Sequence, residues 1–410
     1  MKKAGKWRKG LAVFLCGVLL CPILTACQQE TGKQPVLSVE DIGEWQKPLA
    51  DFSYEMLRQA AKEEQESILL SPLSVWLALS MTGQGAAGVT KDAFVDFFQQ
   101  MDLETQRQLA SGLLRMEQQS PYLSIVNSIW CDDEITVNDS FLQTVQQSYQ
   151  AEVMQEDLQR RDAVDHVNQW IAESSKERIS HMLEEIDDNI VMLLINCLTL
   201  DAPWQEGFAE GDTYRETFYR AEGNNQEKEF MHKEFAEAQY LSWNDGEGII
   251  LPYEGGELVM VALLPSAHTN CNALVEQLSY QWVAELLDHS AVCKVNLALP
   301  KFAVESKWNL NRICQAMGLG IAFDPQQADF ANLGSCNGTI YLGQALQNCW
   351  LAVDEAGTQA AAATVVEMKR ESAVAADEDV IHLELNRPFV YLIMDSSSQL
   401  PVFSGIYQGE

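Results

Sequence analysis

Residues 354–372 read DEAGTQAAAATVVEMKRES, and their side chains alternate in character with a period of two. In a β-strand, successive side chains point to opposite faces of the sheet, so a strand with one buried face shows this alternation. No large apolar residue precedes Val365, which leaves little apolar area to anchor an ordinary core strand. The stretch could therefore join a sheet without steric conflict and could also remain outside one. The uncharged set is Thr358, Ala360, Ala362, Thr364, Val366 and Met368, and the set that is polar at both ends is Gln359, Ala361, Ala363, Val365, Glu367 and Lys369.

A helix and a loop are the alternatives for the same stretch. The four residues Ala360, Ala361, Ala362 and Ala363 favour a helix, because alanine has the highest helix propensity. Thr358, directly after Gly357, could serve as its N-cap. From these residues alone, helix, loop and strand all stay open, and the rest of the chain has to decide among them.

The N-terminus has the order of a secretory signal: basic residues, an apolar run over 11–23, and then small residues. The apolar run is short for a permanent membrane span. Leu24-Thr25-Ala26-Cys27 resembles a bacterial lipoprotein box, in which the cysteine is lipidated. An ordinary cleavage site with Cys27 as a bystander is the alternative. We expect residues 1–26 to be a lipoprotein signal peptide and 27–44 a lipidated tether, which places the protein outside a bacterial cell on its surface.

The chain is strongly acidic, with a net charge of −32 that becomes about −37 without residues 1–26 (22 basic against 59 acidic residues). Such a surface repels nucleic acid and anionic lipid, so we expect no nucleic-acid partner and membrane association only through the lipid. The remaining cysteines lack the spacing of a zinc site or a disulfide scaffold, and we interpret most of them as small buried hydrophobes, with one or two disulfides of undetermined pairing as the alternative outside the cell. These cysteines are Cys131, Cys197, Cys271, Cys293, Cys314, Cys336 and Cys349.

Periodicity along the chain indicates an α+β protein. Ser71-Pro72 predicts a helix N-cap followed by proline in the first turn, and Gly83 predicts the end of that helix. The run IVMLLINCLTL over 190–200 is typical of a central strand covered on both faces, with the amide of Asn196 buried inside it. We also expect an amphipathic helix over 164–179, strands over 258–265 and 295–300, a helix over 310–317, and a C-terminal hairpin from 388–395 and 400–406.

The chain shows no set of residues that would make it an enzyme. The sequence contains no G-x-S-x-G, H-E-x-x-H, Walker or C-x-x-C motif, and its six histidines are scattered. Gly83, Gly85 and Gly88 spell G-x-G-x-x-G, but they follow a helix, whereas the dinucleotide fingerprint requires a preceding strand. We therefore expect no catalytic residues, no metal and no cofactor.

Short motifs stand in order along the chain: Ser71-Pro72-Leu73-Ser74, Gly85-Ala86 with Thr90, Asn196 with Trp204 and Phe208, Leu251-Pro252-Tyr253, Leu264-Pro265, Leu299-Pro300-Lys301-Phe302, Ala328-Asp329-Phe330 and Phe403-Ser404-Gly405. Together with the features above, these motifs resemble the serpin family over roughly residues 45–407. The resemblance implies one serpin domain over 45–410. In such a domain, helices surround a large central β-sheet with further sheets, and a reactive-centre loop, here at about 355–385, is exposed.

The resemblance also implies a suicide inhibitor of proteases. A target's nucleophile attacks the loop, and the cleaved loop inserts into the sheet before the acyl-enzyme is hydrolysed. Its hinge would be Glu355, Gly357, Thr358 and Ala360 to Ala363, where a charge or proline on the buried set would cost several kcal/mol. A shutter and breach region would contain Ser71, Ser74, Asn196, Trp204 and Gln347, with Gln347 where many relatives have histidine.

The scissile bond stays open among several candidates. Family spacing points to Glu371–Ser372, which suits a Glu-preferring protease, whereas Arg370 or Lys369 suits a trypsin-like enzyme. The long segment after Ser372 leaves room for elastase-like cleavage at Ala373 or Val374. We expect an extracellular serine protease as the partner of a monomeric inhibitor, with a papain-like cysteine protease as a further class. The alternative function is a non-inhibitory binding or carrier module, and the small hinge residues argue against it. A third class, a secreted hydrolase, is disfavoured because this sequence offers no nucleophile paired with a base.

Overall fold

The computed structural model describes residues 42–64, 66–120, 122–174, 182–187, 190–220, 223–358 and 380–410. Helices predominate before residue 175 and strands after residue 190, which confirms the predicted α+β class. The helices are α2 (Gln46–Glu63), α3 (Pro72–Gly83), α4 (Gly88–Phe97), α5 (Leu103–Gln119), α6 (Asp139–Thr144), α7 (Ala163–Ser174), α8 (Cys271–Gln277), α9 (Tyr280–Asp288) and α10 (Asn311–Cys314).

One sheet, which we call the central sheet, contains the site described below. Its strands follow the order β4-β2-β5-β14-β15-β6, and β12 also pairs with β14. The pairs β14·β5 and β2·β4 are parallel, and the other pairs of this sheet are antiparallel. The strands are β2 (Leu123–Asp132), β4 (Glu152–Glu156), β5 (Met192–Leu200), β6 (Ala202–Pro203), β12 (Phe302–Asn309), β14 (Gln344–Val353) and β15 (Gly357–Thr358).

A second sheet is built mainly from the C-terminal half of the chain. Its order is β1-β18-β17-β10-β9-β8-β11-β16, with β7 paired to β8. The strands are β1 (Ile68–Leu70), β7 (Thr213–Phe218), β8 (Gln226–Trp243), β9 (Gly246–Pro252), β10 (Leu258–Pro265), β11 (Ala291–Pro300), β16 (Ile381–Glu384), β17 (Phe389–Asp395) and β18 (Pro401–Tyr407), and β3 (Thr136–Val137) pairs with β13 (Gly334–Ser335) in a separate ribbon.

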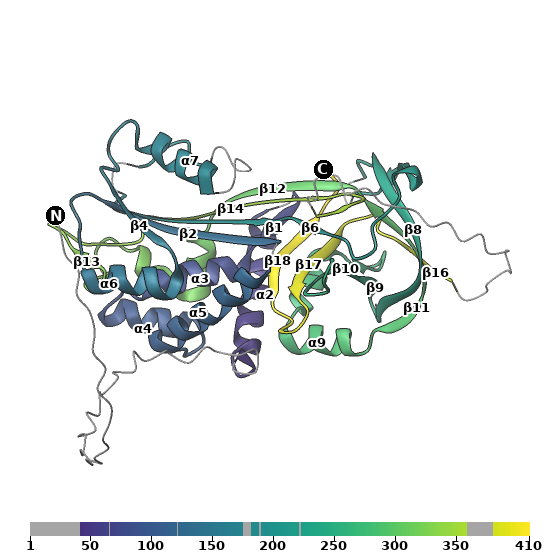
Figure 1. Ribbon diagram of the computed structural model, residues 1–410, viewed down its shortest axis with the longest axis horizontal. Coiled ribbons are helices and arrows are strands. Elements are labelled where there is room, and N and C mark those ends of the chain that lie inside the picture. Colours follow the sequence, from purple (N-terminus) through teal and green to yellow (C-terminus); the bar gives the residue numbers. More distant parts are fainter. Residues whose placement is uncertain are drawn as a thin grey trace, which may run out of the picture. The chain divides into compact units, whose positions relative to one another are not determined.

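Strand β5 shows why the central sheet is buried on both faces. All nine of its residues are buried. Leu193 and Ile195 pack in one apolar cluster with Val167 and Ile171 of α7, whereas Leu194 packs in a second cluster with α3. Figure 1 shows α7 on one side of β2 and β4, with α3, α4 and α5 on the other. An unbroken apolar run therefore forms a strand here because neither face meets water.

Most of the predicted elements are present, and two predictions need correction. Helix α3 begins at Pro72 and ends at Gly83 as expected, but the Ser71 side chain makes no capping hydrogen bond. The helix predicted over 310–317 is α-helical only to Cys314 and continues as a wider π-helical turn over Gln315–Leu319. Gly318 inside that turn has φ +106°, a conformation that glycine adopts without strain, and this interrupts the helix. The C-terminal hairpin is confirmed as β17 and β18.

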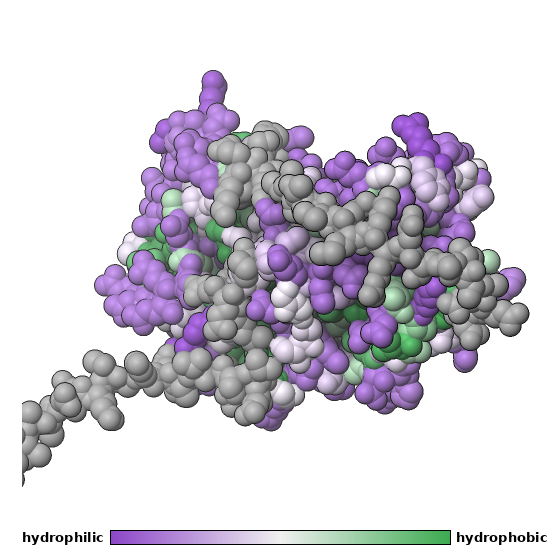
Figure 2. Space-filling view, turned by 45° about the vertical axis from the view of Figure 1, so that its right-hand side comes forward, coloured by the Kyte–Doolittle hydropathy of each residue, from purple (hydrophilic) through white to green (hydrophobic). Residues whose placement is uncertain are grey.

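The described residues meet neither the requirements of a metal site nor those of a membrane-spanning helix. Among them, no group of three or more His, Cys, Asp or Glu side chains could hold a metal ion, and no helix is long and apolar enough to cross a membrane. The seven cysteines from Cys131 to Cys349 are free thiols, and five of them are buried, as the sequence predicted for most of them. The face shown in Figure 2 is mostly hydrophilic where it is described, in keeping with the acidic composition.

Candidate functional site

The chain reverses direction directly after β14, over a segment that we call the hinge, Asp354–Thr358. Asp354 accepts hydrogen bonds at Oδ1 from the amides of Ala356 (2.9 Å) and Gly357 (3.2 Å), and its own amide donates to the Gly357 carbonyl (2.9 Å). An aspartate that binds the backbone two residues on is a common way to hold a tight turn. The turn brings Thr358 into antiparallel pairing with Val353 on one side and Ala202 on the other. The hinge therefore already lies as a short strand between β14 and β6.

Gly357 is required at its position because the neighbouring strand is too close for a side chain. A Cβ atom there would lie 2.3 Å from the Ala202 carbonyl oxygen and 2.5 Å from Cα of Pro203, distances that real Cβ atoms essentially never show. Both contacts are with backbone, which cannot move aside without breaking β6. Close pairing of the hinge with β6 thus depends on glycine.

Two residues from the segment after β6 hold the backbone of the hinge. The Trp204 indole Nε1 donates to the Asp354 carbonyl (2.9 Å), and the Trp204 amide donates to the Ala356 carbonyl (2.9 Å). The amide of Phe208 donates to the Glu355 carbonyl (2.8 Å). Three successive carbonyl groups of the hinge are therefore satisfied by two residues, and Trp204 supplies two of the donors.

The Tyr253 side chain ties Thr358 to Trp204. The rings of Trp204 and Tyr253 are stacked, with centroids 4.5 Å apart and planes 9° from parallel. The Tyr253 hydroxyl lies 2.5 Å from Thr358 Oγ1, and both residues are completely buried. Burial raises the pKa of Tyr253, and the Thr358 hydrogen bond only partly counters this rise, so the phenol stays neutral and able to donate.

An ion pair anchors the Glu355 side chain beside the hinge. Lys301 Nζ lies 2.9 Å from Glu355 Oε2, and Thr213 Oγ1 donates to Glu355 Oε1 (2.8 Å). Only 13% of the Glu355 side chain is exposed. Burial alone would raise the pKa of Glu355, but the hydrogen bonds from Lys301 and Thr213 outweigh it and leave the pKa below its ordinary value. The same pair raises the pKa of Lys301 despite its partial burial.

Below the hinge, β5 and β14 pair directly with each other. The parallel register runs from Gln344 opposite Leu193 to Cys349 opposite Leu198. At the hinge end, Thr358 lies between Val353 of β14 and Ala202 of β6, the strand that follows β5 in the chain. Parallel pairs are slightly less stable per residue than antiparallel pairs. Because this ladder is parallel and begins near the hinge, opening it for an antiparallel strand costs less than opening an antiparallel ladder would.

Buried polar side chains meet beneath that ladder in what we call the shutter cluster: Ser71, Ser74, Asn127, Asn196 and Gln347. Gln347 Nε2 donates to the Ser71 carbonyl (2.9 Å), to Ser74 Oγ (3.2 Å) and to Asn196 Oδ1 (2.7 Å), and its Oε1 accepts from the Ser71 amide (3.1 Å). Ser74 Oγ also donates to Asn196 Oδ1, and Asn196 Nδ2 donates to Asn127 Oδ1 (both 2.7 Å). The cluster joins α3 to β2, β5 and β14 across the region that would have to open.

Two buried polar side chains in the same region have no hydrogen-bond partner among the described residues. One is the Ser71 hydroxyl, and the other is the amide of Asn348, neither of whose polar atoms is satisfied although the residue is completely buried. An unpaired buried polar group costs about 1–3 kcal/mol. Unfavourable burial is therefore present within the shutter cluster, at the Ser71 hydroxyl, and beside Gln347 on β14, at Asn348.

The structure brings together part of the predicted site. Ser71, Ser74, Asn196 and Gln347 meet in one cluster, and Trp204 lies at the hinge with Glu355, Gly357 and Thr358. Sequence reasoning missed Asn127, Thr213 and Tyr253 as contacts of the site, because each meets it only through sheet pairing or folding. The predictions for Cys27, Ala360, Ala361, Ala362, Ala363, Lys369, Arg370, Glu371 and Ser372 lie outside the described residues.

The sequence of this chain matches a known protein family. The family model "Serpin (serine protease inhibitor)" matches residues 47–408, and the chain therefore belongs to the serpin family. Sheep antithrombin-III is 26% identical over 361 residues, covering 84% of this chain and 77% of the sheep protein. An uncharacterised serpin-like protein of Thermococcus kodakarensis is 26% identical over 362 residues, covering 86% of this chain and 83% of that protein.

Solved structures share the fold. The thermophilic serpin tengpin in its native state superimposes with a TM-score of 0.84 at 29% identity, covering 90% of this chain and 94% of tengpin. Tengpin in its latent state gives a lower TM-score of 0.76. Human thyroxine-binding globulin in complex with thyroxine, at 21% identity, gives 0.79, covering 88% of this chain and 97% of that chain. The fold alone therefore does not separate an inhibitor from a carrier.

Proposed function

We propose that this serpin inhibits serine proteases as a suicide substrate whose cleaved loop inserts between β5 and β14. The observation that carries the proposal is the position of Thr358, which is already paired antiparallel to Val353 and Ala202 at the end of a direct β5–β14 ladder. A longer strand can grow from this position, because each further residue gains ladder partners on both sides. No catalytic residue of this chain is required, since the target protease supplies the nucleophile.

The hinge register supports insertion of the small-residue set. Continued along β14, the Val353–Thr358 register would place Ala360 opposite Leu351 and Thr364 opposite Gln347. Continued along β5, the Ala202–Thr358 register would place Thr364 opposite Asn196. The two extrapolations agree, because Gln347 and Asn196 already face each other across the ladder. In the inserted state Thr364 would enter the shutter cluster, where its hydroxyl could replace the hydrogen bonds lost between the two amides.

The proposed reaction follows from this geometry. The target's serine attacks the loop carbonyl, the peptide bond to the following residue breaks, and the new amine leaves with the C-terminal fragment. Because the acyl group is carried on the loop, insertion draws the attached protease along the central sheet and distorts it before water attacks. The scissile bond remains one of the candidates Lys369 to Val374, so trypsin-like, elastase-like and Glu-preferring enzymes, with papain-like cysteine proteases as a further class, are the proposed targets.

The test mixes the protein with trypsin, elastase and a glutamate-specific protease and examines each mixture on a denaturing gel. We expect a covalent adduct with at least one enzyme, and the mass of the released C-terminal peptide identifies the scissile bond. Thr358→Ser serves as the matched control for Thr358→Arg, because serine keeps the hydroxyl near Tyr253 while arginine cannot be buried there. Complete cleavage of the wild-type chain without any adduct would overturn the proposal and favour the carrier function.

We further propose that the protein is monomeric and is anchored to the bacterial surface by a lipid on Cys27. The support is the order of basic, apolar and small residues before that cysteine. Expression of the full chain with Cys27→Ser is expected to release it from the membrane fraction into the medium. A Cys27→Ser variant that stays in the membrane fraction would contradict the anchor.

A further inference from the structure

A pocket with a volume of about 100 Å³ lies beside the hinge, between β8, β9 and the segment after β6. Aromatic and aliphatic side chains, among them Trp204, Phe208, Phe235 and Leu251, form much of its wall. This volume is smaller than the cavity of about 150 Å³ that is known to hold a benzene ring, so the pocket can take only the end of one side chain or a group of similar size. Its apolar wall with a few polar groups is typical of a binding site.

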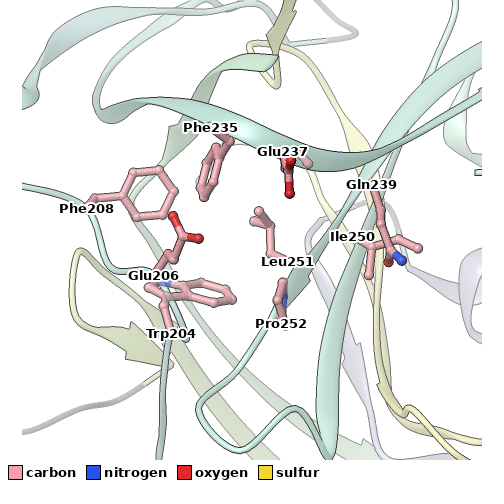
Figure 3. A pocket seen from close by; sticks show the side chains of 10 residues that line it. Trp204, Glu206, Phe208, Phe235, Glu237, Gln239, Ile250, Leu251 and Pro252 are labelled. Carbon is pink, nitrogen blue, oxygen red and sulfur yellow. The ribbon is translucent and has the colours of Figure 1, made fainter. Parts of the chain in front are cut away.

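Two carboxylates give the pocket a negative charge. Glu206 and Glu237 both line it, and Figure 3 shows their carboxylates directed toward the space bounded by Phe208, Phe235 and Leu251. Glu237 forms no ion pair with any residue that the structure describes, whereas Glu206 lies 3.4 Å from Lys233 Nζ. Both glutamates are exposed to water, and their carboxylates give the pocket a negative potential that favours a cation over an anion.

A lysine of the chain itself already makes the contacts expected of such a cation. The Lys233 ammonium lies 4.9 Å from the centroid of the Phe235 ring and donates to the Gly207 carbonyl (2.8 Å). An ammonium or guanidinium group over an aromatic ring is attracted by the negative face of the ring. Aromatic faces beside carboxylates are therefore cation-binding surfaces in this part of the fold, and Glu237 provides a second carboxylate that Lys233 does not neutralise.

We propose that the pocket binds an alkylguanidinium group, carried either by a small molecule or by an arginine side chain. A guanidinium is planar and can stack on an aromatic ring such as Trp204 while its N–H groups reach a carboxylate in a bidentate manner. Its alkyl stem matches the apolar wall formed by Leu251 and Ile250. The proposal is independent of protease inhibition, because it concerns the intact, uncleaved chain.

Occupation of the pocket is coupled to the hinge through shared residues. Trp204 and Phe208 line the pocket, and the same two residues bind the carbonyls of Asp354, Glu355 and Ala356. If the hinge left the sheet, Trp204 would lose two hydrogen-bond acceptors and keep its stacking on Tyr253, so its present position would be held less firmly. A ligand that requires that position therefore favours the hinge-paired state, and by linkage the paired hinge favours the ligand.

The first experiment measures binding of agmatine to the intact protein by calorimetry, with butylurea as the uncharged analogue and acetyl-arginine amide as the peptide-type source. We expect saturable binding of agmatine in the millimolar range or tighter, and none of butylurea. Binding of acetyl-arginine amide but not agmatine would assign the site to a peptide arginine, whereas the reverse would assign it to a small-molecule guanidine; both support the site. Absence of saturable binding by either guanidine would overturn it.

Because the whole chain is acidic, matched variants must separate the pocket from general attraction. Glu237→Gln is expected to weaken agmatine binding about tenfold, as loss of one charge-assisted contact predicts. Glu227→Gln removes the same charge from the same strand outside the pocket and keeps an acceptor for Thr217, so it should change affinity less than twofold. Equal weakening by both variants would show that agmatine binds only through net charge and would overturn the proposal.

The second experiment tests the coupling by hydrogen exchange. Agmatine is expected to slow exchange of the amides of Trp204 and Phe208, which donate to hinge carbonyls. Thr358→Val, which removes the bond to Tyr253 outside the pocket, should weaken agmatine binding although it touches no ligand. Agmatine binding that leaves both measurements unchanged would overturn the coupling to the hinge.

Discussion

Gln347 and Asn348 are neighbouring buried amides on β14, and we expect their substitution to change stability in opposite directions. Gln347 makes four hydrogen bonds within the shutter cluster, whereas neither polar atom of Asn348 has a partner among the described residues. Both residues are completely buried. The same kind of side chain, one position apart, is thus stabilising in one case and unfavourable in the other.

The magnitudes follow from the contacts. Gln347→Met keeps length and shape but removes the partner of the Ser71 amide, which is buried and would be left unsatisfied. The Ser71 carbonyl keeps bonds from Val75 and Ser74, so the loss is about 3 kcal/mol rather than the sum of four bonds. Asn348→Leu is close to isosteric and relieves the burial of an unpaired amide, for a gain of about 2 kcal/mol.

Guanidinium unfolding followed by tryptophan fluorescence and circular dichroism measures both changes. The midpoint should fall for Gln347→Met and rise for Asn348→Leu, with the slope of the transition unchanged. Unfolding rates at fixed denaturant provide a second measure if refolding is incomplete. A midpoint lowered by Asn348→Leu as much as by Gln347→Met would refute the reasoning, because it would show that Asn348 has a partner.

Three further outcomes test the hinge. The pKa of Glu355 is lower in the folded chain than its ordinary value of 4.5, so the Lys301–Glu355 pair stabilises the fold above that pH, and this contribution is lost as the pH falls through the folded-state pKa. The unfolding midpoint of the wild type should therefore drop more steeply below pH 4.5 than that of Glu355→Gln. Parallel curves for the two proteins would contradict the role of the pair. Thr358→Arg or Ala360→Arg should turn the inhibitor into a substrate that is cleaved without a denaturation-stable adduct, and an unchanged adduct yield would count against insertion. Cleavage of the loop in wild type should raise the melting temperature, because insertion adds ladder pairs and relieves strain, and a cleaved form of equal heat resistance would favour a carrier.

Local patterns predicted much of the fold. The apolar run at 190–200, the strand at 258–265 and the C-terminal hairpin are all present, because burial on both faces or a short turn leaves a clear mark in the adjacent sequence. Helix, loop and strand are the three alternatives for residues 354–372, and at the start of this stretch Gly357–Thr358 form a strand. The later residues, 359–372, lie outside the described part of the chain.

Contacts between distant segments could not be predicted in the same way. Ser71 has the sequence of a helix cap, yet both of its backbone polar groups are bound by Gln347, 276 positions away, and its hydroxyl has no described partner. Asn127 and Thr213 are ordinary polar residues in their local sequence and reach the site only because strands far apart in the chain lie side by side. The resemblance to a family supplied the shutter residues, but only the structure shows which atoms they join.

If the loop inserts as we propose, the Gly357–Thr358 pairing fixes the end from which the new strand grows and supplies its first pairs. Starting a new strand is the slow part of sheet growth, because several dihedral angles are fixed before any ladder forms. In the intact chain that first step is already complete, and the nearest β5–β14 pair, Leu198 with Cys349, lies four positions along each strand from Ala202 and Val353. The loop would then enter the sheet from the hinge end only. Its rate of entry would be set by how quickly strands β5 and β14 separate ahead of it.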